Sequence, residues 1–98
     1  MYIKIHYAHR KVVAVCDEEL IGRKFEEGKR QLDVRENFYK GEEVSEKKAK
    51  KILEMSAKDY ATFNIVGDKS VNLALECGLI TKGNIGKVDG VPFALVLL

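Results

Sequence analysis

The C-terminal segment constrains the fold more than any other part of the chain. Residues 91–98 carry no charged side chain, and the last six of them form an unbroken apolar run. Asp89 and Gly90, just before this segment, form a dipeptide that favours tight β-hairpin turns. The pattern predicts a hairpin that joins residues 85–88 to residues 91–98. Because an exposed strand of this composition would aggregate, we expect the last strand to be largely covered.

A second hairpin is predicted at the N-terminus. Residues 2–7 alternate between apolar and polar side chains, and residues 12–16 form the apolar, β-branched run of a strand that is covered on both faces. A two-residue loop at positions 9–10 would place Ile3 opposite Cys16. Neither loop residue is the glycine that such a turn prefers, so a longer loop is the alternative.

The histidines and cysteines do not assemble into a site in this register. Cys16 would share a face with Ile5, whereas His6 would point to the opposite face, which excludes a Cys–His nucleophile pair. His6 and His9 lie on a strand and its turn and would not share a metal, so we interpret both as structural. Cys16 and Cys77 are interpreted as buried free thiols, which indicates a reducing cytoplasm.

Two segments have the periodicity and end signals of helices. Residues 45–60 begin at Ser45, a capping residue type, and residues 69–77 follow Asp68, which we expect to cap the second helix. Gly78 is placed to end that helix in a left-handed conformation. The predicted apolar face of the first helix comprises Ala49, Ile52, Leu53, Ser56, Ala57 and Tyr60.

The remaining elements complete an α+β fold. Asp17 is expected to cap a short helix that Gly22 ends, and residues 31–35 and 61–66 are read as strands. The second of these strands, followed by a helix, could form one parallel pair. The prediction is a single α+β domain over residues 1–98, with a predominantly antiparallel or mixed sheet and two main helices.

Composition excludes several classes of protein. Hydrophobic residues make up 46% of the 98 residues and charged residues 33%, which excludes a disordered or low-complexity chain. No apolar run reaches the length of about 18 residues that spans a bilayer, so no membrane partner is expected. Seventeen basic residues against fifteen acidic ones leave a net charge of +2, which excludes a histone-like polycation.

One basic cluster stands out on the first predicted helix. Lys47, Lys51 and Lys58 lie within about 40° of one another on a helical wheel, opposite the apolar face, with Glu54 among them. A solvated helix face is the simpler interpretation. The alternative is a surface that contacts RNA or a ribonucleoprotein, because lysines near aromatic side chains are typical of such surfaces.

A polar pocket is the second candidate site. It would combine Asp17, Glu18, Asn64 and Asp68, if the two acid-bearing turns converge in space. The segment from Asn64 to Asp68 also has the form of a phosphate-receiving turn, but one glycine is too weak a signal and an acid at the helix start would repel an anion. No catalytic constellation, metal site or cofactor motif is predicted.

Four segments, taken together, resemble a known family. They are residues 15–25 (VCDEELIGRKF), 32–42 (LDVRENFYKGE), 64–68 (NIVGD) and 90–94 (GVPFA). In this order they resemble an archaeal family of small conserved proteins, domain of unknown function 424. The resemblance covers essentially the whole chain. It implies an archaeal, cytoplasmic, single-domain α+β protein without an assigned activity, and it supplies no catalytic residues.

Three functions follow as hypotheses. The first is a non-enzymatic binding or accessory module, associated with translation or RNA, because the chain lacks a catalytic constellation and has a lysine-rich helix face. The second is a small enzyme that uses the polar pocket near Asp17 and Asp68. The third is a structural homo-oligomer, which would associate through the Phe38–Tyr39 segment or the C-terminal strand.

Overall fold

The protein is built on one central sheet, whose strands carry apolar side chains on both faces. The computed structural model describes residues 1–98. The sheet has the spatial order β5-β1-β2-β6-β8-β7, and β2 and β6 are its parallel pair. It is therefore mixed, as the sequence predicted. Its strands are β1 (Tyr2–Tyr7), β2 (Lys11–Cys16), β5 (Glu42–Glu43), β6 (Thr62–Val66), β7 (Gly86–Val88) and β8 (Val91–Leu97).

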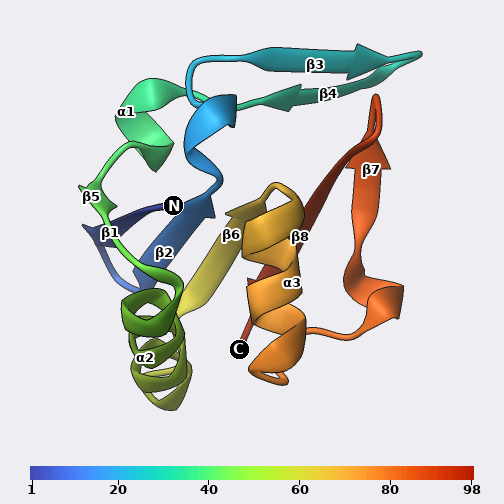
Figure 1. Ribbon diagram of the computed structural model, residues 1–98. Coiled ribbons are helices and arrows are strands. Elements are labelled where there is room, and N and C mark those ends of the chain that lie inside the picture. The colour runs from blue at the N-terminus through green and yellow to red at the C-terminus, as the bar shows by residue number, and fades with distance from the viewer.

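The two main helices cover one face of this sheet. They are α2 (Glu46–Lys58) and α3 (Asp68–Glu76), which lie side by side in Figure 1. Removing their apolar stripes from water is the main energetic reason that the helices dock here. The buried residues of this layer include Ile3, Val13, Val15, Ala49, Leu53, Phe63, Ile65, Val71 and Ala74.

A second, smaller layer covers part of the other face. It consists of η1 (Glu18–Leu20), the hairpin of β3 (Lys24–Glu27) and β4 (Arg30–Asp33), and α1 (Glu36–Tyr39). Figure 1 shows this hairpin and α1 at the end of the sheet where β2 finishes. The sequence predicted β4 in part and missed β3, α1 and β5, which are short elements. The buried residues here are Ala14, Cys16, Leu20, Phe25, Val34, Tyr39, Val66 and Val88.

The register of the N-terminal hairpin differs from the prediction by one residue. Ile3 pairs with Val15 and Tyr2 pairs with Cys16, because the loop has three residues, 8–10, instead of two. A shift of one residue turns every side chain of a strand to the other face. Cys16 therefore lies on the face of His6, and the prediction that it shares a face with Ile3 and Ile5 was wrong.

Local signals placed two of the helix ends correctly. The Ser45 hydroxyl accepts a hydrogen bond from the Lys48 amide at 3.2 Å, so Ser45 caps α2 as predicted. Gly78 follows the end of α3 with φ of +72°, the left-handed conformation expected of it. The N-cap of α3 is Gly67, and Asp68 is the first residue of the helix. The prediction that Asp68 caps α3 was therefore wrong.

The last strand is only partly covered. Ala94 and Val96 pack against the helical layer, but Leu95 and Leu97 are 56% and 70% exposed. β7 is too short to cover the whole edge of β8, because it pairs only with the residues from Val91 to Phe93. The expectation that this strand is largely covered thus holds for its first half and fails for its second.

The whole chain forms one compact unit. Its Cα radius of gyration is 12.4 Å, close to the value of about 13 Å expected for one domain of this length. None of the helices combines the length and the apolarity that crossing a membrane requires.

Candidate functional site

The two acid-bearing turns of the sequence meet in space. Because β2 and β6 run parallel, their carboxyl ends lie at the same edge of the sheet, and the Asp17 amide bonds to the Val66 carbonyl at 3.1 Å. The Asp17 carboxylate accepts hydrogen bonds from the Lys69 amide at 3.0 Å and from the Ser70 amide at 2.8 Å. The Ser70 hydroxyl donates a third bond at 2.7 Å. Asp17 therefore caps α3 from a distant part of the chain.

This arrangement explains how a carboxylate can be almost fully buried. Asp17 is 3% exposed, and an isolated charge at such a position would be strongly unfavourable. Here the amides at the start of α3 and the positive end of its dipole stabilise the negative charge. The same carboxylate occupies the place that an anionic ligand would take. Asp17 occupies the N-cap position of its own short helix, as predicted, but its side chain makes no hydrogen bond within η1.

The other members of the predicted polar pocket do not surround a cavity. Glu18 and Asp68 are exposed on their turns, and Asn64 lies half-buried on β6 beside Leu95. The two cavities of the protein lie elsewhere, at the helical layer. One of about 160 Å³ is lined by Glu46, Lys69, Asn72, Leu73 and Glu76. One of about 220 Å³ is lined by Leu53, Glu54, Ala57, Cys77, Gly78, Leu79 and Leu98.

His6 and Cys16 have structural environments, whereas His9 is exposed on the loop between β1 and β2. The His6 ring stacks on Phe38 at a centroid distance of 4.6 Å, and its Nε2 lies 2.9 Å from the Phe38 carbonyl oxygen. Cys16 is fully buried, and burial raises its pKa to about 12, so its thiol is a poor nucleophile. His6 shares its face but pairs with Val12, about 13 Å further along the strands. Distance, rather than opposite faces, therefore separates Cys16 from His6.

Cys77 is only half-buried, beside the larger cavity. Burial is the main cause that raises the pKa of its thiol, and the Glu54 carboxylate adds to the effect. No group of three or more histidine, cysteine, aspartate or glutamate side chains is placed to hold a metal ion.

The lysines of α2 give this helix the largest net charge of any helix or strand in the protein. Its 13 residues contain five lysines and two glutamates, a net charge of +3. The rest of the chain has twelve basic and thirteen acidic residues, a net charge of −1. Lys47, Lys51 and Lys58 are exposed, as predicted, and make no ion pair. Lys50 is also exposed and unpaired, whereas Lys48 pairs with Glu42.

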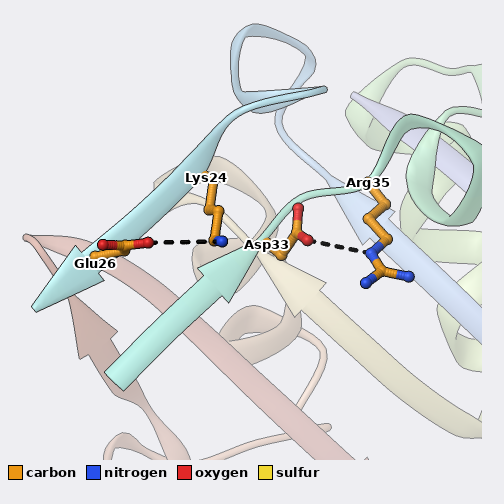
Figure 2. Close-up of polar contacts among 4 residues, drawn as sticks. All are labelled: Lys24, Glu26, Asp33 and Arg35. Atoms are coloured by element: carbon orange, nitrogen blue, oxygen red, sulfur yellow. Dashed lines mark hydrogen bonds and ion pairs between the residues drawn. The ribbon is translucent and has the colours of Figure 1, made fainter. Parts of the chain in front are cut away.

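Four of the twelve basic residues outside α2 form ion pairs, compared with one of the five lysines of α2. In Figure 2, Lys24 pairs with Glu26 on β3 at 3.6 Å, and Asp33 at the end of β4 pairs at 3.1 Å with Arg35, which follows the strand. Exposed pairs of this kind contribute little stability, roughly 0–1 kcal/mol. Their effect on the surface is electrostatic, because each pair cancels a positive charge, whereas Lys47, Lys50, Lys51 and Lys58 of α2 have no such partner.

An exposed tyrosine ends α2 in a strained conformation. Tyr60 has φ of +56° and its side chain is 70% exposed, so the prediction that it belongs to the apolar helix face was wrong. Its amide bonds to the Ala57 carbonyl and the next amide, of Ala61, bonds to the Ser56 carbonyl. These two bonds form a Schellman motif, in which the left-handed position normally holds glycine.

The end of α3 has the same motif with the expected residue. Gly78 donates to the Leu75 carbonyl and Leu79 donates to the Ala74 carbonyl, both at 3.0 Å. The chain thus contains two equivalent helix ends, one with glycine and one with tyrosine. A left-handed conformation costs about 1–2 kcal/mol for a residue with a Cβ. Strain of this kind can mark a functional position.

Sequence reasoning missed the roles of Asp17, Gly67 and Tyr60. Asp17 and α3 are separated by about fifty residues along the chain, so no local pattern connects them. Tyr60 lies at the end of a predicted helix, where a left-handed cap can occur. Such a cap usually holds glycine, so a tyrosine at this position did not indicate one.

Comparison with known proteins agrees with this architecture. A solved structure, described as an uncharacterized conserved protein from Methanopyrus kandleri, matches with a TM-score of 0.85 and 27% sequence identity. The match covers 97% of this chain and 88% of the other. No curated protein matches the chain. The family model described as protein of unknown function (DUF424) matches residues 5–98, and the chain belongs to this family.

Proposed function

We propose that this protein is a cytoplasmic, non-enzymatic binding module that contacts single-stranded RNA through the outer face of α2. We call this surface the lysine face, and it comprises Lys47, Lys50, Lys51 and Lys58. The observation that carries the proposal is the distribution of charge: α2 has a net charge of +3, whereas the rest of the chain is slightly negative. Concentrated positive charge attracts phosphates even when the total charge of a protein is small.

Tyr60 supplies the second element of such a surface. It follows directly on the helix that carries the lysine face, and its side chain is free to stack on a base. Stacking on an aromatic ring contributes about 1–3 kcal/mol per base and tolerates any sequence. A binding role would also explain why a strained tyrosine occupies a position that suits glycine.

An enzymatic function has less support from the same geometry. The carboxylate of Asp17 is occupied by three hydrogen bonds at the start of α3. The remaining polar residues of the predicted pocket are spread over exposed turns and one strand. None of them lines a cavity that could hold a substrate.

Replacing three lysines of the lysine face tests the proposal. In the variant Lys47→Gln/Lys51→Gln/Lys58→Gln we expect weaker binding of a mixed-sequence single-stranded RNA, measured by fluorescence anisotropy at several salt concentrations. The negative slope of log affinity against log salt should become shallower by about 2, at roughly 0.7 for each lost phosphate contact. Stability should change by only a few tenths of a kcal/mol, because all three side chains are exposed.

A matched variant separates a local surface from total charge. Lys29, Lys82 and Lys87 are exposed, make no ion pair and lie outside α2. Their triple change to glutamine lowers the net charge by the same amount. Equal losses of affinity in the two triple variants, or unaltered binding in the α2 variant, would contradict the lysine face as the RNA surface.

Tyr60→Gly should separate stability from binding. We expect it to raise the free energy of unfolding by about 1 kcal/mol, because glycine adopts the left-handed conformation without strain, while RNA affinity falls. Gly78→Ala at the equivalent end of α3 should lower stability by about 1 kcal/mol and leave RNA affinity unchanged. Thermal unfolding and RNA titration measure both effects. If Tyr60→Gly binds RNA as well as the natural protein, Tyr60 has no binding role.

A further inference from the structure

We propose that two copies of the chain associate through the outer edge of β8, in one defined register centred on Val96. This surface is independent of the lysine face, because it is an edge of the sheet rather than a face of α2. The observations that carry it are the unpaired backbone groups of β8, the exposed side chains beside them, and the absence of charge along the strand.

The hydrogen bonds of β8 show which backbone groups are free. The Gly67 amide bonds to the Pro92 carbonyl at 2.9 Å, so the backbone of Pro92 points toward β6. In an antiparallel pair every second residue points the same way, so Ala94 and Val96 also face β6. The amides and carbonyls of Leu95 and Leu97 therefore point outward. β7 begins at Gly86, opposite Phe93, so it does not run alongside Leu95 or Leu97. Figure 1 shows β8 continuing past β7 toward the C-terminus.

These four groups are exposed to water in a single copy of the chain, and their geometry fits an extended strand as a partner. No backbone group of the protein outside the sheet pairs with the outer side of Leu95 or Leu97. Their side chains are exposed on one face of the sheet, and neither Val91 nor any later residue carries a charge. An unpaired apolar edge without a charged residue to protect it readily pairs with another strand.

A second copy satisfies these requirements by symmetry. If two β8 strands run antiparallel about a two-fold axis at Val96, Leu95 of each copy lies opposite Leu97 of the other. Both are outward-pointing positions, so the arrangement pairs all four free groups of each copy in one continuous sheet. Other registers would need Phe93, which β7 already pairs, or residues beyond the strand. The leucines would also cover one another, and no like charges would meet.

Sedimentation equilibrium tests the association directly. We expect the mass to rise from 11.1 kDa toward twice that value as the concentration increases from micromolar to millimolar. Leu97→Lys should raise the dimer dissociation constant by about tenfold or more, because an edge lysine disfavours strand pairing. Met55→Lys is the matched control, since Met55 lies on α2 and is exposed to a similar extent, 67%. It should leave the association unchanged.

Cysteine cross-linking tests the register. In a Cys77→Ser background, Val96→Cys should form a disulfide-linked dimer under mild oxidation, because directly opposed residues of this kind lie about 4.5 Å apart between Cα atoms. Leu95→Cys and Leu97→Cys should not, because each would lie about 8 Å from its own counterpart, too far for a disulfide. A protein that stays monomeric, a dimer insensitive to Leu97→Lys, or equal cross-linking at all three positions would overturn the proposal.

Discussion

Replacing Asp17 with alanine is expected to lower the free energy of unfolding by about 3 kcal/mol. The substitution leaves two amides at the start of α3 and the Ser70 hydroxyl without their acceptor. The Ser70 groups are buried, so water cannot easily replace the carboxylate. Losing an N-cap alone costs about 0.5–2 kcal/mol, and each buried donor left unsatisfied adds to this. Denaturant unfolding monitored by circular dichroism measures the loss.

Two companion variants identify the reason for the loss. Asp68→Ala removes the acid that the sequence predicted as the cap, and we expect it to cost only a few tenths of a kcal/mol, because Asp68 is exposed and its side chain makes no hydrogen bond at the helix start. Asp17→Asn keeps one acceptor oxygen, so its loss in the free energy of unfolding should lie between those of Asp17→Ala and Asp68→Ala. Similar effects of Asp17→Ala and Asp68→Ala would contradict the role of Asp17 as the cap of α3.

Replacing Gly67 with alanine is expected to cost about 3–5 kcal/mol. Gly67 has φ of +107° and ψ of 157°, a conformation that is essentially restricted to glycine and costs other residues about 1–3 kcal/mol. A Cβ added here would also lie 2.3 Å from the Asp17 Cγ atom, so the carboxylate would have to move. The substitution therefore introduces strain and disturbs the cap of α3 at the same time.

Gly90→Ala separates these two contributions. Gly90 also has a positive φ, of +77°, but a Cβ there would meet no atom within 4 Å, so we expect a loss of only about 1 kcal/mol. In the double variant of Asp17→Ala with Gly67→Ala, the loss should be smaller than the sum of the single losses, because the cap can be lost only once. Additive losses would show that Gly67 does not act through Asp17.

The two proposed surfaces use features of different kinds. The lysine face depends on the charges of one helix, whereas the edge of β8 depends on backbone groups that have no partner. Changes at Lys47, Lys51 and Lys58 are therefore expected to leave the association of two copies intact. Leu97→Lys is expected to separate the copies without removing any group of the lysine face.

Much of the secondary structure followed from local sequence patterns. The strands β1, β2, β6 and β8 and the helices α2 and α3 correspond to predicted segments, because each has either a hydrophobic period or a largely apolar run bounded by turn signals. Ser45 and Gly78 were also assigned correctly. Both act on backbone groups within about five residues of their own position. The elements that were missed, β3, α1 and β5, have only two to four residues and too little sequence for a periodic pattern.

The pairing of β1 with β2, and with it the face of Cys16, depends on the length of one loop. A three-residue loop instead of a two-residue loop moved Cys16 from the predicted face to the opposite one. The sequence indicated that a longer loop was an alternative, since positions 9 and 10 lack glycine. It could not choose between the two loops, because that choice depends on how the side chains of both strands pack against distant elements.

The sequence by itself therefore determined the longer segments, their types, the fold class and the lysine stripe on α2. Only the tertiary structure decided that Asp17 caps α3, that Tyr60 is exposed in a strained conformation, and that the end of β8 lacks a partner. The physical reason is the range of the interactions. Helix periodicity and turn preferences act between near neighbours in the chain, whereas Asp17 bonds to residues more than fifty positions away. Whether the outer edge of β8 is covered depends on how far a separate strand, β7, extends along it.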